Sequence, residues 1–168
     1  MATSAVAANT NTNLSLSPDA RQRLRKRETT VQGHYNDGGG NRGHCTFGIG
    51  ILVHRGPCTA EELQRPLAAT QIEASFDVAV RDAERAVRRN VTNQALTQGQ
   101  FDALVSYTCN TGATGASSVF RRVDSGDLQG AAEVISRNVN SRQDGRMVRM
   151  RGLVLRREEE SAPFRATR

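Results

Sequence analysis

Residues 28–50 read Glu28-Thr-Thr-Val-Gln-Gly-His-Tyr-Asn-Asp37-Gly-Gly-Gly-Asn-Arg-Gly-His-Cys-Thr46-Phe-Gly-Ile-Gly50. Two carboxylates and a hydroxyl stand around a Gly-rich segment, and these are the parts of a hydrolytic site. A glycosidase needs one protonated carboxyl group to donate to the leaving oxygen, and a second, ionised one to direct water or attack carbon. Glu28 and Asp37 are therefore candidates for these two roles.

The local context places these side chains on different rigid elements. Residues 17–19, Ser-Pro-Asp, predict a helix start, and the helix runs to about Glu28. A strand is expected around residues 31–35, with a second, paired strand over residues 46–53. The first carboxylate would then lie at a helix end, the second at a hairpin tip and the hydroxyl at the start of the return strand.

These residues resemble the signature of the phage-type lysozymes or endolysins, glycoside hydrolase family 24. The signature is a Glu, eight residues, an Asp, a short spacer and Thr-x-Gly-x-Gly, and here Glu28, Asp37 and Thr46-Phe-Gly48-Ile-Gly50 follow in that order. The spacer of residues 38–45 is about three residues longer than the commonest pattern, although extra loop length costs little entropy. This difference leaves the position of Thr46 relative to Asp37 open.

Two further blocks extend the resemblance to roughly residues 18–164. Residues 96–112 look like the family's central-helix segment, and residues 152–160 look like its closing helix. The resemblance implies an α+β, mostly α, lysozyme-like two-lobed fold. We expect a small β-hairpin lobe over about residues 29–66, and a larger helical lobe over about residues 67–168 together with the N-terminal helix.

The sequence also predicts the domain organisation and the remaining helices. Residues 1–16, rich in Ala, Thr, Asn and Ser, are expected to be a disordered or loosely packed tail before a single catalytic domain of residues 17–168. Helices are predicted by capping signals and by apolar spacing at three and four residues. They lie at about Thr59–Pro66, Thr70–Asn90, Thr97–Gly112, Ser117–Val123, Asp127–Ile135 and from Arg146 onward, the last presenting Val148, Leu153 and Leu155 to the core.

The resemblance assigns roles to the three central residues. Glu28 would protonate the glycosidic oxygen, Asp37 would hold or activate the attacking water, and Thr46 would orient that water. The implied enzyme is a lysozyme or N-acetylmuramidase. It would hydrolyse the β-1,4 bond between N-acetylmuramic acid and N-acetylglucosamine, with inversion, and so lyse bacterial cells.

Five further residues are candidates for contacts with substrate. His44, in the inserted part of the loop, would touch it; Gly48 and Gly50 would let the strand approach it, although a plain bulge also explains them. Asn110 would bond a sugar amide or simply cap its helix. The closing helix is expected to offer Arg149, Arg151 and Arg156, of which Arg149 is favoured as the residue that orients the first carboxylate, with a surface ion pair as the alternative for each.

The composition is compatible with this function but does not select it. The chain has 23 Lys and Arg residues against 17 Asp and Glu residues, a net charge of +6 and an isoelectric point near 10.2. A basic surface attracts polyanions, including the anionic polymers of bacterial walls and nucleic acids. Bacterial peptidoglycan is the expected partner, with no nucleic acid, no stable membrane insertion and a monomeric state.

The thiols and histidines give no sign of a cofactor. Cys45, Cys58 and Cys109 are an odd set, and free thiols are the default in a reducing cytoplasm, with a bridge between Cys45 and Cys58 after export as the alternative. His34, His44 and His54, considered with Cys45 and Asp37, lack the close spacings of a zinc site. No metal and no cofactor are expected.

The N-terminal sequence has neither a basic start nor an apolar core, so it does not read as a signal peptide. We expect synthesis in the cytoplasm and action on the wall in the periplasm, after holin-type release or delivery. Three alternatives stay open: a catalytically impaired peptidoglycan-binding module, a delivered antibacterial effector with the same activity, and a basic helical nucleic-acid binder.

Overall fold

The computed structural model describes residues 11–28, 33–38, 40–47, 51–66, 68–143 and 146–165. The chain divides into two compact units. We call residues 18–81 with 140–150 the sheet unit, and residues 1–17, 82–139 and 151–168 the helical unit. No helix among the described residues is both long enough and apolar enough to cross a membrane.

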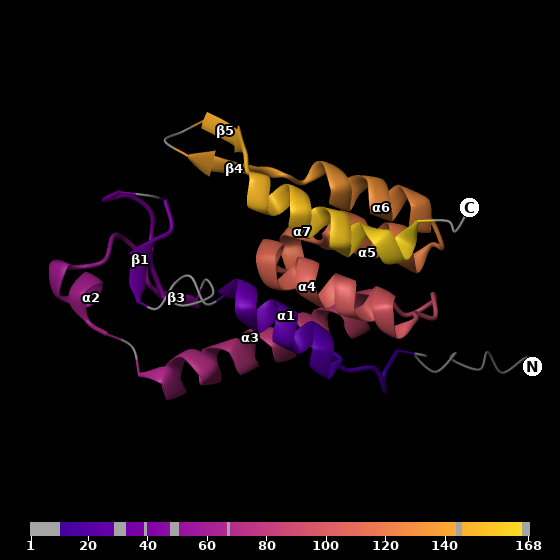
Figure 1. Cartoon of the computed structure of the whole chain (residues 1–168), viewed down its shortest axis with the longest axis horizontal. Coiled ribbons are helices and arrows are strands. Elements are labelled where there is room, and N and C mark those ends of the chain that lie inside the picture. Colours follow the sequence, from indigo (N-terminus) through magenta and orange to yellow (C-terminus); the bar gives the residue numbers. More distant parts are fainter. Residues whose placement is uncertain are drawn as a thin grey trace, which may run out of the picture. The chain divides into compact units, whose positions relative to one another are not determined.

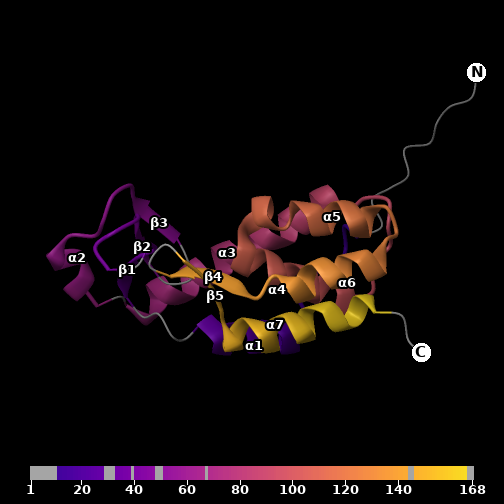
Figure 2. The ribbon, with the colours of Figure 1, turned by 90° about the horizontal axis from the view of Figure 1, so that it is seen from above.

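The sheet unit carries a small antiparallel meander between helices. Along the chain it contains α1 (Pro18–Glu28), β1 (His34–Asn36), β2 (Cys45–Phe47), β3 (Ile51–His54), α2 (Ala60–Gln64), the first half of α3 (Ala69–Asn90), β4 (Asn140–Gln143) and β5 (Arg146–Arg149). The three-stranded sheet has the order β1-β2-β3, with Tyr35 opposite Thr46, and β4 pairs with β5 (Figures 1 and 2).

Phe76 joins α1 to the first half of α3. Its side chain is 1% exposed, and the guanidinium carbons of Arg21 and Arg25 lie 5.0 and 5.8 Å from the centre of its ring. Ion pairs from Arg21 to Asp77 and from Arg25 to Glu73 continue this contact. Because an arginine stem packs on apolar surface while its head stays charged, α1 is held along this side by its arginines.

The predicted return strand over residues 46–53 is wrong in one respect. The chain forms two antiparallel strands there, β2 and β3, with Phe47 opposite Ile51. Residues 48–50, with Gly48 and Gly50, lie outside the described residues between these strands. The prediction places both glycines inside a strand, although glycine weakens a strand.

The helical unit is built from four further helices around one apolar core. These are α4 (Gln98–Gly115), α5 (Ser117–Asp124), α6 (Leu128–Arg137) and α7 (Arg151–Ser161), followed by the 3₁₀ helix η1 (Ala162–Phe164). The buried side chains include Phe101, Leu104, Tyr107, Phe120, Ile135 and Phe164. Side chains of Thr97 and Asp127 cap α4 and α6, as predicted.

The prediction for the closing helix is wrong in its start and in its buried face. Residues 146–149 form the strand β5, and α7 begins only at Arg151. Val148 and Leu155, expected in the core, are 38% and 64% exposed. Instead α7 buries two arginines and a glutamate, because these charges neutralise one another within the helix.

This charged cluster is fully hydrogen-bonded. Glu160 pairs with Arg156 Nε at 2.9 Å and Arg157 Nη1 at 2.5 Å, and it accepts a hydrogen bond from the Ser106 hydroxyl at 2.6 Å. Arg157 Nη2 donates to Asn110 Oδ1, which ties the end of α4 to α7. Buried charges are tolerated when they are paired in this way.

One smaller expectation also needs correction. Within residues 11–16, part of the expected tail, Asn11 and Leu16 are buried: the Asn11 side chain donates to Val91 O at 3.0 Å and Gln94 O at 2.9 Å, and the backbone N–H of Leu16 donates to Glu84.

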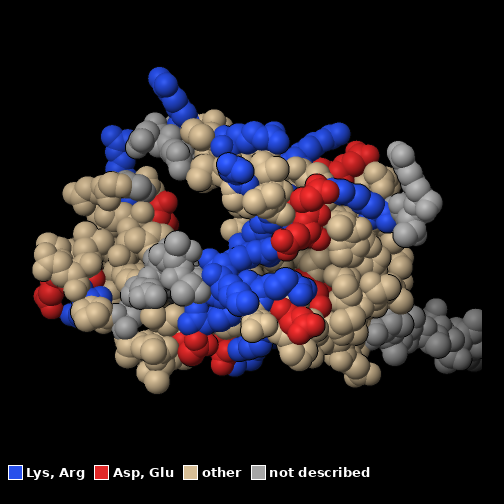
Figure 3. Space-filling view, viewed as in Figure 1, with Lys and Arg blue, Asp and Glu red and all other residues tan. Residues whose placement is uncertain are grey.

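Much of the positive charge is paired locally. Figure 3 shows basic and acidic side chains next to one another over this face. Ion pairs join Arg85 to Asp82, Arg88 to Glu84, Arg122 to Asp127 and Arg165 to Glu158. The pairs of Arg85, Arg122 and Arg165 are exposed, and exposed pairs contribute little to stability.

Candidate active site

The three residues predicted to carry catalysis all belong to the sheet unit. Glu28 is the last residue of α1, Asp37 directly follows β1, and Thr46 is the central residue of β2. The side chain of Glu28 lies outside the described part of the structure. The arrangement of the other two follows from the loop between β1 and β2.

Asp37 and His44 close this loop at its base. The backbone N–H of Asp37 donates to His44 O at 3.1 Å, and the backbone N–H of His44 donates to Asp37 Oδ1 at 2.6 Å. The spacer thus forms a loop whose end, at His44, is hydrogen-bonded to Asp37 at its start. Because this closure continues the pairing of Asn36 with Cys45, the longer spacer leaves the strand register intact.

Gly43 is required for this closure. Its φ is +87°, in the left-handed region that favours glycine, and a Cβ there would lie 2.1 Å from Asp37 Oδ1 and 2.4 Å from Gly38 N. Gly40 also has a positive φ, +57°, but a Cβ there would meet no atom within 4 Å. Gly43 is thus a residue that positions Asp37, and the sequence signal for it was only the general richness in glycine.

Thr46 is coupled to Asp37 through a single carbonyl group. Its hydroxyl donates to His44 O at 3.2 Å, the same oxygen that accepts from the Asp37 backbone. The Thr46 side chain is held on β2, where the residue is 3% exposed, whereas Asp37 is exposed. Among the described residues no donor contacts the Thr46 hydroxyl oxygen, so its acceptor lone pairs stay available.

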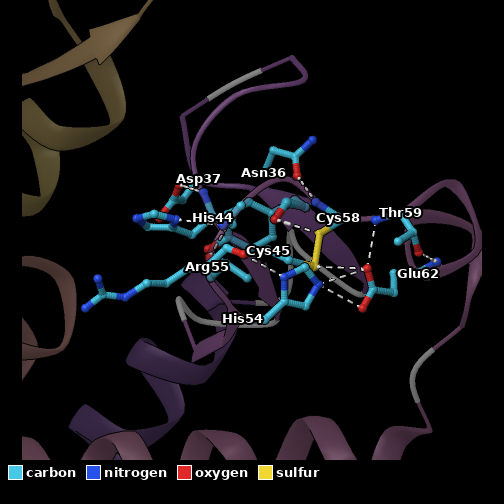
Figure 4. The surroundings of a disulfide bond; sticks show 12 residues. Asn36, Asp37, His44, Cys45, His54, Arg55, Cys58, Thr59 and Glu62 are labelled. Atoms are coloured by element: carbon cyan, nitrogen blue, oxygen red, sulfur yellow. Dashed lines mark hydrogen bonds and ion pairs between the residues drawn. A yellow bond between two sulfur atoms is a disulfide. The ribbon is translucent and has the colours of Figure 1, made fainter.

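His44 is anchored on one side of its ring. Its Nδ1 accepts a hydrogen bond from the backbone N–H of Gly56 at 3.1 Å, so the neutral ring carries its proton on Nε2. The residue is exposed beside Asp37 (Figure 4). This position is compatible with the predicted contact to substrate, which stays a prediction.

A disulfide ties β2, the strand that carries Thr46, to the segment before α2. Cys45 and Cys58 are bonded, which corrects the expectation of free thiols. The side chain of Asn36 supports the same junction, since Oδ1 accepts from Cys58 N at 2.7 Å and Nδ2 donates to Gly40 O at 2.7 Å. Asn36 was not singled out in the sequence, because only the folded loop brings its two partners together.

Beside the disulfide, His54 and Glu62 form a second polar pair. His54 Nε2 lies 3.0 Å from Glu62 Oε1, and Glu62 Oε2 accepts from the backbone N–H of Thr59 at 2.7 Å (Figure 4). The bond from Thr59, followed by that from His54, lowers the pKa of Glu62 to about 2. Hydrogen bonds to the Arg55 carbonyl and to Glu62 raise the pKa of His54.

The other candidate residues are dispersed. Gly48 and Gly50 lie outside the described residues. Asn110 is exposed in the helical unit, and its Oδ1 accepts from Arg157. Arg149 is exposed on β5, opposite Asn140, and not on the closing helix as predicted.

Comparisons with known proteins cover most of the chain. The model of the phage lysozyme family matches residues 25–160. Among curated proteins, no relative is similar enough in sequence to count as a match.

Solved structures of a muramidase domain and of phage endolysins are similar to this chain over most of its length. The muramidase domain of SpmX from Asticaccaulis excentricus has a TM-score of 0.67 and 25% identity, covering 92% of this chain and 99% of that one. The endolysin from Escherichia coli O157:H7 phage FAHEc1 has a TM-score of 0.68 and 26% identity, covering 90% and 94%. The P1 phage endolysin Lyz, in its active form, shares the fold at 22% identity and a TM-score of 0.63, covering 92% and 86%.

These findings confirm the predicted lysozyme-like α+β fold. The family match includes the whole Glu28–Thr46 segment and extends into α7, well over half of the chain. The chain belongs to the phage lysozyme family.

Proposed function

We propose that this chain is a muramidase that hydrolyses the β-1,4 bond between N-acetylmuramic acid and N-acetylglucosamine of peptidoglycan with inversion. Membership of the phage lysozyme family supports a peptidoglycan-cleaving glycosidase. The observation that carries the finer proposal is the closed loop between Asp37 and His44. It sets Asp37 opposite His44, so that Asp37 lies at the end of the paired strands, two positions from the Tyr35–Thr46 pair.

In this mechanism Asp37 and Thr46 hold the attacking water between them. Asp37 Oδ1 is occupied by the backbone N–H of His44, which leaves Oδ2 for the water. The Thr46 hydroxyl donates to His44 O and accepts from the same water through its oxygen. Glu28, at the end of α1, protonates the glycosidic oxygen, which leaves with the proton as the water attacks from the opposite face and gives up one of its own protons to Asp37.

The proposed place of action is an oxidising compartment outside the cytoplasm, reached by release or delivery. The disulfide between Cys45 and Cys58 supports this proposal, because structural disulfides persist in the periplasm and outside cells and are rare in a reducing cytoplasm.

Product analysis tests the proposed bond specificity. Purified sacculi are digested, the new reducing ends are reduced with borohydride, and the resulting sugar alcohols are identified by mass spectrometry. A muramidase yields the alcohol of N-acetylmuramic acid, whereas the alcohol of N-acetylglucosamine would assign the other glycosidic bond.

Glu28→Gln keeps the shape of the side chain and should lower the rate at least ~10²-fold, since general acid catalysis contributes about that much.

The same experiment addresses an impaired wall-binding module. Such a module would sediment with sacculi and release no new reducing ends. If Glu28→Gln keeps more than about a tenth of the wild-type rate, against the 10²-fold loss expected for a missing proton donor, Glu28 is not the general acid.

A further inference from the structure

Four side chains with metal-binding atoms meet at the disulfide end of the sheet unit. Cys45 lies on β2, His54 ends β3, Cys58 precedes α2, and Glu62 lies within α2. The ligand atoms of Cys45, His54 and Glu62 all lie within 4.8 Å of one another, and Cys58 is bonded to Cys45 (Figure 4). Within the described ranges, no other group of three or more such residues is this close.

The spacing of these atoms is close to that of a tetrahedral zinc site. Zn–S bonds of about 2.3 Å and Zn–N or Zn–O bonds of about 2.0–2.2 Å place neighbouring ligand atoms roughly 3.3–3.8 Å apart. Cys45 Sγ lies 3.8 Å from Glu62 Oε2, and His54 Nε2 lies 3.0 Å from Glu62 Oε1. The two sulfurs, 2.06 Å apart in the disulfide, must separate on reduction before both can bind the same ion.

The ring of His54 is oriented as in a metal ligand. Its Nδ1 faces the Arg55 carbonyl at 3.1 Å, which leaves Nε2 directed at Glu62. Zinc-bound histidines typically donate their second ring N–H to a carbonyl or carboxylate in this way, which fixes the tautomer. The charged head of Arg55 points away from the cluster in Figure 4, so it leaves the ligand atoms open to a cation.

The cluster also has a route for an ion to enter. The side chains of His54 and Glu62 are 40% and 19% exposed, whereas Cys45 and Cys58 are almost fully buried behind them. An ion approaching from solvent meets the imidazole and carboxylate first. In the disulfide the sulfurs carry no thiolate charge, so they become ligands only after reduction.

We propose that the reduced chain binds one Zn²⁺ ion through Cys45, Cys58, His54 and Glu62, so that the ion replaces the disulfide as the link between β2 and the start of α2. A dithiol reductant supplies two electrons and two protons, which break the S–S bond to two thiols, and the reductant itself becomes a disulfide. Zinc then displaces both thiol protons, and the Nε2 proton of His54 where the ring is charged, to solvent, and binds two thiolates, one imidazole and one carboxylate. In the reverse step a disulfide oxidant accepts two electrons from the two thiolates and two protons from solvent and becomes a dithiol, while the S–S bond forms again and the ion is released.

Cobalt absorption tests this site without any measurement of activity. The untagged full-length chain is reduced with a phosphine, which binds metal weakly, and is titrated with Co²⁺ under anaerobic conditions. We expect a thiolate-to-cobalt charge-transfer band that saturates at one equivalent and disappears when one equivalent of Zn²⁺ is added. The oxidised chain should show no such band.

Substitutions then assign the ligands. Cys45→Ser and Cys58→Ser should each lose most of the band, and Cys109→Ser, which removes the third cysteine, should leave it unchanged. His54→Gln and Glu62→Gln keep both thiols and can be folded in the disulfide form before reduction, so their result does not depend on the cysteine variants folding. Each should weaken Zn²⁺ affinity at least tenfold in competition with a chromogenic chelator.

Two results would overturn the proposal. The first is a reduced wild-type chain that gives no thiolate band with Co²⁺. The second is wild-type affinity in both His54→Gln and Glu62→Gln, which would mean that a free dithiol alone binds the metal. Neither result would bear on the proposed muramidase activity, because the measurements use the chain without substrate.

Discussion

Asp37 and His44 exchange two hydrogen bonds, one from each backbone N–H: Asp37 donates to the carbonyl of His44, and His44 donates to the carboxylate of Asp37. The spacer between Asp37 and Thr46, which is longer here than in the commonest form of the family signature, is therefore closed by hydrogen bonds at its base. Its extra residues are accommodated outside the strand pairing, and Thr46 keeps its position opposite Tyr35. The insertion does not separate the two residues proposed to hold the water.

A methyl group at position 43 should damage catalysis more than one at position 40. In Gly43→Ala the new Cβ would lie 2.1 Å from Asp37 Oδ1, so the carboxylate must move, whereas Gly40→Ala meets no atom within 4 Å. Both variants share the strain of a positive φ, so their difference isolates the contact. We expect Gly43→Ala to lose roughly 10²-fold in lytic rate, since a misplacement of about 1 Å can cost that much.

Turbidity clearance of purified sacculi gives the rates of the two variants, and circular dichroism verifies their folding. Equal losses in folded Gly43→Ala and Gly40→Ala would show that Asp37 is not positioned by the loop closure.

Asp37 and Thr46 should act as a unit. Asp37→Ala and Thr46→Ala should each be severely impaired, and the double variant should be little slower than the slower single variant, because groups that hold one water are not additive. Thr46→Ser keeps the hydroxyl and is the matched control, expected to stay within about tenfold of the wild-type rate. Rates that multiply in the double variant would mean that the two residues act independently.

The buried charges of α7 should be essential for stability. Glu160→Ala leaves Arg156 and Arg157 without their carboxylate partner in a nearly water-free site. Breaking such a pair costs about 3–5 kcal/mol. For a chain of this size that corresponds to a fall in Tm of roughly 6–20 °C.

Glu159→Ala, on the exposed side of the same helix, is the control and should shift Tm by no more than about 2 °C, as is usual for surface substitutions. Calorimetry measures both variants. Equal Tm values for Glu160→Ala and the wild type would show that the cluster contributes nothing to the fold.

The pair of His54 and Glu62 gives a defined pH window. His54 has a raised pKa, so its contribution to the free energy of unfolding is complete below the usual value of 6.5 and is lost as the pH rises through the higher folded value. Glu62 has a pKa lowered from 4.5 to about 2, so its contribution is complete above pH 4.5 and is lost as the pH falls towards 2. The pair should stabilise the oxidised chain most between about pH 4.5 and 6.5.

Urea midpoints of the wild type and His54→Gln, measured from pH 3 to pH 9, check this window. The difference between the two proteins should be largest inside the window and should shrink on both sides. A difference that does not vary with pH would mean that the pair is not ionised in the folded state.

Local signals in the sequence were sufficient for most of the helices. The capping boxes of Thr59 with Glu62 and of Thr97 with Gln100 form as predicted, because each joins groups only three residues apart. The strands β4 and β5 were missed, although Asp144-Gly145 between them is a strong hairpin signal.

Contacts between distant residues could not be derived from the sequence. On α4, the Ser106 hydroxyl donates a hydrogen bond to Glu160 of α7, and Asn110 Oδ1 accepts one from Arg157 of α7. These contacts explain why α7 buries charge where apolar residues were expected. The order Glu28, Asp37, Thr46 identified the candidate site, but the loop closure and the role of Asn36 depend on the folded chain.

The central claim is that Asp37 directs a water molecule and does not itself attack the sugar. The most direct test is the anomer first released from a defined β-linked muropeptide oligomer, followed by NMR during the first turnovers. Attack by water on the face opposite the leaving group inverts the anomeric carbon, whereas a covalent intermediate on Asp37 would retain its configuration. We predict that the α-anomer appears first; initial release of the β-anomer would contradict the mechanism and make Asp37 a nucleophile.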